Sequence, residues 1–246
     1  MVAALAVLET ATPALGDARA GLVNTPRLII VRHGSTRFNS EEPNRFRAWL
    51  DVPLTEQGMK QSQAIANTLS SIKFDRIFSS DLQRALVTAH MIQKAQPQPA
   101  PEVVPAVALR PWHIGELAGK PTEGEHLDTM MHHQLDDQQT APPGGESFND
   151  FLARFVGFLA ERMKEARAQG LTECLVSHTR NQRVMDGLIK TGMKGIDRKT
   201  LASKDHMDPA GAQEFCYGGG KWKLDKEIVP GKTSLESEIG KRRLRT

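Results

Sequence analysis

The chain has 246 residues and a formal net charge of +3, with 39% hydrophobic and 25% charged residues. This composition is typical of a globular protein with a real core, and the length suits one large α/β domain, with or without a small insertion. So small a net charge does not argue for binding to nucleic acid or to a membrane surface. No stretch approaches the roughly 18 apolar residues that a membrane-spanning helix needs.

The first 26 residues are rich in alanine and leucine. A secretory signal would begin with a basic region and continue with a longer apolar run, whereas no basic residue precedes Arg19 and Glu9 interrupts the run. We therefore expect residues 1–26 to be a poorly ordered extension and the protein to be cytoplasmic. Cys174 and Cys216 lie far apart in predicted strands, so we expect two buried thiols and no disulfide or metal site.

A short run of branched apolar residues, Ile29 to Val31, leads directly into Arg32, His33 and Gly34. The run predicts a fully buried strand, and ligands of open α/β sheets bind outside the carboxyl ends of the strands. Arg32 offers a planar fork that suits phosphate. His33 can act as a nucleophile, a general base or a metal ligand. Gly34 allows the backbone to approach a ligand closely.

The next part of the chain repeats this layout. Hydrophobic spacing predicts, in order, a helix over residues 55–72 with Thr55 as N-cap, a strand over 76–78, a helix over 81–94 and a strand over 102–108. Arg84 falls in the first turn of the second helix, near the carboxyl end of the strand before it. Pro105 places the last of these strands at an edge or a bend.

Residues 119–150 break the pattern, because they are rich in Gly, Pro, His, Asp and Gln. We interpret them as a lid or insertion, with one or two short helices over 122–135 lying over the site. The elements predicted after position 135 are a helix over 146–168, a strand over 174–176, a helix over 180–193 and a hairpin of strands 212–217 and 221–224. His178 follows its strand almost as His33 follows the first one. We expect the polar, basic residues 225–246 to be a disordered tail.

Strands that alternate with helices predict an α/β fold with a mainly parallel central sheet and helices on both faces. In such a sheet the two histidines and two arginines at the strand ends would converge. The chain resembles the histidine phosphatase superfamily, phosphoglycerate mutase-like branch, in Arg32-His33-Gly34, Asn39, DVPLTEQG, SSDLQRALVTA and Ser177-His178. The resemblance covers roughly residues 27–224, which we take as the domain.

The resemblance implies a phosphoglycerate mutase-like fold with a small helical lid, and it assigns roles to the residues. His33 would be the nucleophile that forms a phosphohistidine, and Arg32, Arg84 and His178 would form the phosphate pocket. Asn39, Gly34 and Thr179 would also bind the phosphate of a small phosphorylated substrate. The resemblance implies no metal and no cofactor, and the oligomeric state is not readable from the sequence.

The general acid is where this chain departs from the family's pattern. The family usually carries a glutamate in a Leu-x-Glu segment, and in the matching stretch LRPWHIGELAG that position is Pro111. Proline cannot protonate a leaving alkoxide. Glu116 in the same segment is our first candidate for this role, and Glu123, Glu146 and His113 are weaker candidates.

The sequence therefore predicts a metal-independent phosphatase of phosphomonoesters that works through phospho-His33. A phosphoglycerate-type mutase is the alternative within enzymes. A catalytically weak phospho-ligand or protein-binding member of the fold is the alternative that Pro111 motivates. A metallohydrolase that uses His33 and His178 is disfavoured by the scarcity of carboxylates in the motifs. The residues that set the substrate are expected within 119–150 and at Arg45, Arg47 and Trp49.

Overall fold

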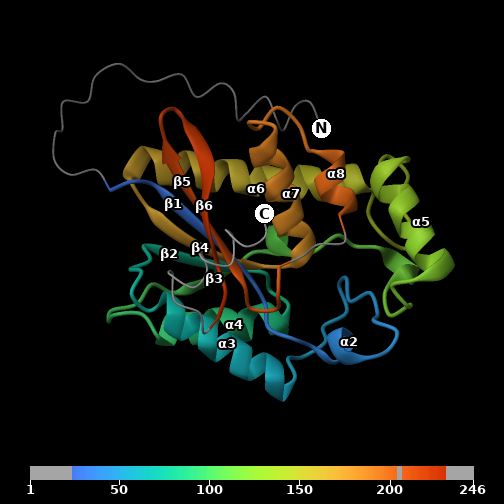
Figure 1. Cartoon of the computed structure of the whole chain (residues 1–246), viewed down its shortest axis with the longest axis horizontal. Coiled ribbons are helices and arrows are strands. Elements are labelled where there is room, and N and C mark those ends of the chain that lie inside the picture. The colour runs from blue at the N-terminus through green and yellow to red at the C-terminus, as the bar shows by residue number, and fades with distance from the viewer. Residues whose placement is uncertain (1–23, 204–206, 231–246) are drawn as a thin grey trace, which may run out of the picture.

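The computed structural model describes residues 24–203 and 207–230, which are built around one six-stranded sheet with the order β3-β2-β4-β1-β5-β6 (Figure 1). The strands are β1 (Arg27–Arg32), β2 (Arg76–Ser79), β3 (Val103–Pro105), β4 (Thr172–Ser177), β5 (Ala212–Gly218) and β6 (Lys221–Ile228). The first four are parallel to one another, and β5 and β6 run antiparallel as a hairpin at one edge. The predicted mainly parallel α/β fold is confirmed.

The central strands β1 and β4 are buried on both faces of the sheet. Alternate residues of β1 enter two separate apolar clusters, with Leu28 and Ile30 in one and Ile29 and Val31 in the other. Burial on both faces explains why this strand reads as a continuous run of branched residues instead of an alternating pattern.

Helices cover both faces, as predicted. On one side of the sheet lie α6 (Phe148–Gln169) and α7 (Thr179–Lys190), and on the other lie α3 (Glu56–Leu69) and α4 (Gln83–Lys94) (Figure 1). The predicted N-cap of α3 is confirmed, because the Thr55 hydroxyl accepts a hydrogen bond from the backbone N–H of Gly58.

Several boundaries differ from the prediction, and three of them bear on the site or on the extent of the domain. Helix α4 begins at Gln83 and not at Asp81, because the Asp81 carboxylate forms a bidentate ion pair with Arg110. The predicted strand over 102–108 shortens to the edge strand β3 and is followed by a 3₁₀ turn, Val107–Leu109. Strand β6 runs on to Ile228, past the predicted domain boundary at 224, because residues 225–228 continue the pairing with β5.

A short helix that the sequence did not predict, α8 (Arg198–Ala202), follows α7 and is capped by the Asp197 carboxylate. At five residues it is too short to show a helical period. Another short helix, α2 (Arg37–Ser40), lies in the loop after β1.

The predicted lid, residues 119–150, divides into three parts with different partners. Residues 119–122 exchange backbone hydrogen bonds with residues 44–46. A single helix, α5 (Gly124–Leu135), packs beside α8 at the periphery, where the Gln134 side chain donates to the Leu201 carbonyl (Figure 1). The last residues are already the first turn of α6. The segment is therefore anchored to the domain at both ends and along its helix.

Several expectations fall at the ends of the chain. The expected disorder of residues 1–26 and 225–246 concerns segments that lie, apart from 24–26 and 225–230, outside the described residues. Both cysteines are free thiols, and Cys174 is buried while Cys216 is partly exposed. Within the described ranges, none of the helices has the length and apolar character to cross a membrane.

Candidate active site

The two predicted histidines meet at the carboxyl edge of the sheet. Strands β1 and β4 are neighbours and pair Arg32 with Ser177, so the residues that follow each strand, His33 and His178, come together. Their rings are 5.1 Å apart between centroids in an edge-to-face arrangement. Only 2% of His33 and 4% of His178 is exposed. The convergence expected from the strand ends is thus present in the structure.

The backbone fixes the tautomer of His33. Its Nδ1 lies 2.6 Å from the carbonyl oxygen of Gly34, and because a carbonyl can only accept, Nδ1 carries the proton. Nε2 then holds the free lone pair. Burial, with the positive charges of Arg84, Arg47 and Arg32, holds the pKa of His33 well below its ordinary value. The ring is therefore neutral and available for nucleophilic attack at neutral pH.

His178 has the same electrostatic surroundings. Burial is the main cause that lowers its pKa well below 6.5, followed by the charges of Arg84 and its other cationic neighbours. Its Nε2 is buried and has no hydrogen-bond partner among the described residues. A buried polar atom without a partner is costly in a native structure, and it is expected where a ligand supplies the missing contact.

Both predicted arginines lie near the two histidines, and only 1% of each is exposed. Arg32 donates to the backbone carbonyl of Met207, and Arg84 donates to the carbonyls of Leu50 and Ala48 at 2.7 and 2.8 Å. The Nε atoms of both arginines are buried without a partner in the described chain. Burial lowers the pKa of each guanidinium to about 9, which leaves both charged at pH 7.

A third arginine belongs to this group. The sequence indicated Arg47 only as a residue expected to set the substrate, yet its charge contributes to the lowered pKa of His33, His178, Arg32 and Arg84. Arg47 lies in an irregular loop with no hydrophobic period and no motif at its own position. The residue type was visible in the sequence, but its proximity to the histidines was not.

Gly34 lies in close contact with the start of α3, and its predicted contact with the phosphate stays a prediction. A Cβ added there would lie 2.3 Å from the Gly58 carbonyl oxygen and 2.6 Å from the Ser62 hydroxyl. The close approach that requires glycine is therefore to the start of α3. Gly34 serves the site through its carbonyl, which orients His33.

The two other predicted phosphate contacts are less direct. The side-chain oxygen of Asn39 accepts from the backbone N–H of Thr36 at 2.9 Å, as part of a capping box for α2. Thr179 is the first residue of α7 and lines a cavity of about 640 Å³ between α7, α8 and the β5–β6 hairpin. Of the residues described, neither His33 nor His178 lines that cavity. Phosphate binding by Asn39 and Thr179 stays a prediction.

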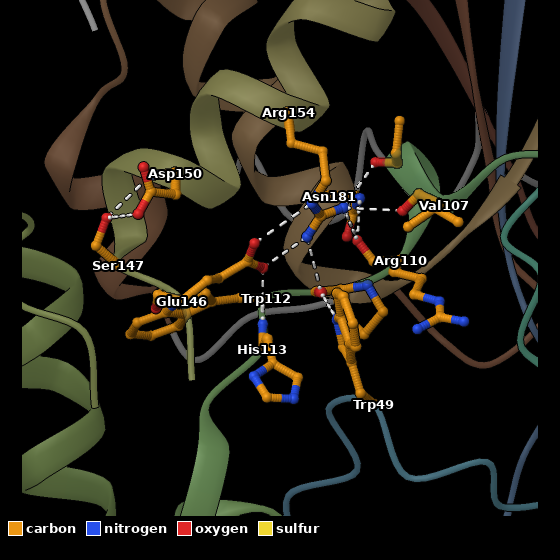
Figure 2. A network of polar contacts seen from close by, with 12 residues as sticks. Trp49, Val107, Arg110, Trp112, His113, Glu146, Ser147, Asp150, Arg154 and Asn181 are labelled. Atoms are coloured by element: carbon orange, nitrogen blue, oxygen red, sulfur yellow. Dashed lines mark hydrogen bonds and ion pairs between the residues drawn. The ribbon is translucent and has the colours of Figure 1, made fainter. Parts of the chain in front are cut away.

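The segment that should carry the general acid is held by a polar network (Figure 2). The Pro111 carbonyl accepts from the Trp49 indole N–H at 2.8 Å, and Arg154 donates to that carbonyl and to those of Val107, Ala108 and Arg110. The Glu146 carboxylate binds Arg154 at 2.6 Å and the His113 backbone N–H at 2.9 Å. These partners give Glu146 a structural role, and its position in the sequence needs no proton-transfer function to explain it.

The remaining candidates for the acid differ in exposure. Glu116 lies exposed in a 3₁₀ turn, Gly115–Leu117, and Glu123 is exposed at the start of α5. The ring of His113 is partly buried and packs edge-on against Trp49 with centroids 4.4 Å apart. None of the three carboxyl or imidazole groups hydrogen-bonds to the histidine pair in the described residues.

The side chains that are spaced for a metal ion lie away from the two histidines. In the part of the chain that the structure describes, one group of side chains has its ligand atoms spaced for a metal ion, and it consists of Glu214, Cys216 and Asp225 on the hairpin. Glu214 is already paired with Arg27 at 2.5 Å and with Lys226 at 3.1 Å. No such group includes His33 or His178 in those residues, so a metallohydrolase centre at the histidines gains no support.

Comparisons with known proteins agree with this geometry. The model of the histidine phosphatase superfamily (branch 1) matches residues 28–228. A 2,3-bisphosphoglycerate-dependent phosphoglycerate mutase of Gloeobacter violaceus is 32% identical over 196 residues, which are 77% of this chain and 82% of that protein.

Two solved structures are also similar. Mycobacterial hydrolase 1 is 26% identical with a TM-score of 0.69, over 85% of this chain and all of its own. The mycobacterial glucosyl-3-phosphoglycerate phosphatase is 25% identical with a TM-score of 0.67 over the same shares. The paired histidines, the buried arginines and these matches together show that the chain belongs to branch 1 of the histidine phosphatase superfamily.

Proposed function

We propose that the protein hydrolyses phosphomonoesters through a phosphohistidine on His33. The observation that carries this proposal is the hydrogen bond of Nδ1 to the Gly34 carbonyl, which directs the lone pair to Nε2. Nε2 attacks the phosphorus, the bond from phosphorus to the ester oxygen breaks, and the alkoxide takes up a proton. Water then attacks the phosphohistidine, releases inorganic phosphate and restores the neutral ring.

The arginines and His178 stabilise the transferring group. A phosphoryl group in transfer spreads negative charge over its equatorial oxygens, and preorganised donors in a dry site stabilise that charge strongly. Arg32 and Arg84 have buried N–H groups free for this task, and the unpartnered Nε2 of His178 supplies a further contact. Because burial and the neighbouring arginines hold the pKa of His33 low, the nucleophile is not lost to protonation.

The proton for the leaving group is the weakest part of the machinery. Pro111 occupies the position of the acid, and its carbonyl is engaged with Trp49. We keep Glu116 as the proposed donor, reached from an exposed position. A general acid contributes about 10² to 10⁴ in rate, so esters with good leaving groups should react far better than alkyl phosphates.

Hydrolysis is preferred over mutase activity, although relatives carry both names. The support for hydrolysis is the altered acid segment and the similarity to a solved phosphatase. The support for a mutase is the name of the Gloeobacter relative. With 3-phosphoglycerate, a phosphatase releases inorganic phosphate and a mutase accumulates 2-phosphoglycerate, and ³¹P NMR distinguishes the two products.

The decisive test is hydrolysis of p-nitrophenyl phosphate in excess chelator, combined with rapid acid-free quenching to trap phosphoenzyme. We expect turnover and an acid-labile, base-stable phosphoryl label in the native protein, and neither in His33→Asn. His90→Asn on the exposed face of α4 is the matched control and should behave as the native protein. Binding of inorganic phosphate without turnover would instead favour the phospho-ligand-binding alternative.

A further inference from the structure

The peptide group between Gly34 and Ser35 is bound at both of its polar ends. Its carbonyl oxygen, which belongs to Gly34, lies 2.6 Å from Nδ1 of His33. Its N–H, which belongs to Ser35, donates to the side-chain oxygen of Gln61 at 2.9 Å. A peptide group is planar and rigid, so a rotation that released Gln61 would also turn the carbonyl away from the imidazole. Gln61 therefore restrains the group that orients the nucleophile.

Gln61 reaches this peptide from α3, together with two other residues on the same side of the helix start. Thr55, Gly58 and Gln61 are spaced by three positions, which places them on one helix face. Thr55 donates to the Ser35 carbonyl from its backbone N–H at 2.9 Å and from its hydroxyl at 3.3 Å. Gly58 lies so close to that carbonyl that a Cβ would not fit between them. This face of α3 thus holds Ser35, and Gln61 binds the peptide that Ser35 shares with Gly34.

The orientation of the Gln61 amide follows from its partner. The Ser35 N–H can only donate, so the oxygen of the amide must face it. Within residues 24–203 and 207–230, the Gln61 side chain makes no other hydrogen bond. Gln63, on the same helix, instead donates to the Asn67 side chain on the exposed surface at 2.9 Å. Of these two glutamines, only Gln61 connects the helix to the turn that follows β1.

The position of His33 itself does not depend on Gln61. The backbone N–H of His33 donates to the Ser177 carbonyl at 3.2 Å, and its carbonyl accepts from the Ala210 N–H at 3.1 Å. The two catalytic arginines are held by backbone carbonyls of other segments. Gln61 therefore acts on the hydrogen bond of the imidazole ring, and so on which ring nitrogen carries the proton.

We propose that Gln61 is a positioning residue, which holds the Gly34–Ser35 peptide so that the proton of His33 stays on Nδ1 and the lone pair on Nε2. This inference rests on the proposed function. A bound N–H makes the carbonyl of the same peptide a stronger acceptor, because hydrogen bonds in series polarise one another. Without Gln61, a fraction of the protein would carry the proton on Nε2, where it blocks attack on phosphorus.

Three substitutions of Gln61 test this role. Gln61→Met keeps the length of the side chain but has no oxygen, and Gln61→Asn keeps an amide that is one methylene shorter. Gln61→Glu keeps the acceptor and is the conservative variant. Gln63→Met, which removes the surface bond to Asn67, is the matched control on the same helix. Circular dichroism checks that each variant folds, and the two variants that lose the contact can replace one another.

The tautomer of His33 is measured by ¹⁵N NMR, because a ring nitrogen that carries a proton and one that does not resonate far apart. The signals of His33 are those that disappear in His33→Asn. At neutral pH we expect the proton on Nδ1 alone in the native protein, in Gln61→Glu and in Gln63→Met. Gln61→Met and Gln61→Asn should show both tautomers.

The effect on chemistry is measured by rapid quenching of the phosphohistidine formed from p-nitrophenyl phosphate. The loss of one hydrogen bond should slow phosphoryl transfer to His33 about tenfold in Gln61→Met and Gln61→Asn. Gln61→Glu should recover most of the rate. The dissociation constant of inorganic phosphate, measured by calorimetry, should stay at its native value because the arginines and His178 are unchanged.

Two outcomes would overturn the inference. One is a proton on Nδ1 alone in every Gln61 variant. The other is an equal loss in phosphate affinity and in the rate of transfer, which would make Gln61 a structural support of the whole loop. Failure of the proposed function is a separate result. A native protein that forms no phosphohistidine, but whose Gln61→Met variant shows both tautomers, would refute the function and still support the control of the tautomer by Gln61.

Discussion

Replacing Arg154 with methionine should destabilise the protein more than any change at an exposed basic residue of the same helix. The Arg154 guanidinium donates to four backbone carbonyls between Val107 and Pro111 and to the Glu146 carboxylate (Figure 2). Methionine keeps much of the apolar stem but removes every one of these donors. The four carbonyls and both oxygens of the Glu146 carboxylate then lose a partner at once.

The expected magnitude follows from the burial of the pair. Breaking a buried ion pair costs about 3–5 kcal/mol, whereas exposed pairs contribute about 0–1 kcal/mol. The side chains of Arg154 and Glu146 are each 19% exposed, and Glu146 keeps the His113 N–H, so the lower end of the buried range applies. We expect a loss of about 3 kcal/mol, or roughly 6–12 °C in Tm for a chain of this size.

Urea unfolding followed by circular dichroism measures this loss. Lys164→Met, an exposed change on α6, is the control and should stay within about 0.5 kcal/mol of the native protein. A loss below about 1 kcal/mol in Arg154→Met, or a loss no larger than that of the control, would show that water replaces these donors without penalty and would refute the reasoning.

Three further predictions concern the site. Gly34→Ala should lower the free energy of unfolding by about 1–3 kcal/mol, because the added Cβ would lie 2.3 Å from the Gly58 carbonyl oxygen. The same variant should lower kcat more than it changes KM. A variant that is as stable in urea and as active as the native protein would contradict this. Folding lowers the pKa of His33 and of His178, so the unfolded chain binds more protons than the folded protein below about pH 6.5. The free energy of unfolding should therefore decrease as the pH drops below that value. A free energy of unfolding that stays constant between about pH 5 and 7 would contradict this. Pro111→Glu should raise alkyl phosphate hydrolysis about 10²-fold with little change for p-nitrophenyl phosphate, whereas Glu116→Gln should lower it if Glu116 is the donor.

Much of the fold was predictable because its strands and helices carry strong local signals. The continuous apolar run in β1 and the N-cap of α3 decided those elements without tertiary information. Boundaries failed where a long-range partner decides the outcome. Asp81 leaves α4 to pair with Arg110, 29 residues away, and the last residues of β6 are set by their register with β5.

The site divides in the same way. His33 and His178 were predictable because each follows a strand whose position in the sheet could be inferred. The place of Arg47 was not predictable, because it depends on hydrogen bonds of Phe46 with residues 119–120 and of Ala48 with Arg84, which no local pattern encodes. Gly34 was identified correctly as special, but the neighbour that requires it, Gly58, is 24 positions away.

The pairing of residues 44–46 with residues 119–122 has a consequence for engineering and for divergence. Phe46 donates to the Lys120 carbonyl, Gly119 donates to the Phe46 carbonyl and Thr122 donates to the Asn44 carbonyl through their backbone N–H groups. The Arg45 side chain also donates to the Gly119 carbonyl at 2.9 Å. A chimaera that took only one of these segments from another member of the superfamily would combine two loops that did not evolve together. Backbone amide and carbonyl groups of both loops would then lack their hydrogen-bond partners. Because the sequence predicts that substrate-setting residues lie in both segments, we expect substrate range to be transplanted, and inherited, as a matched pair of loops about 75 positions apart.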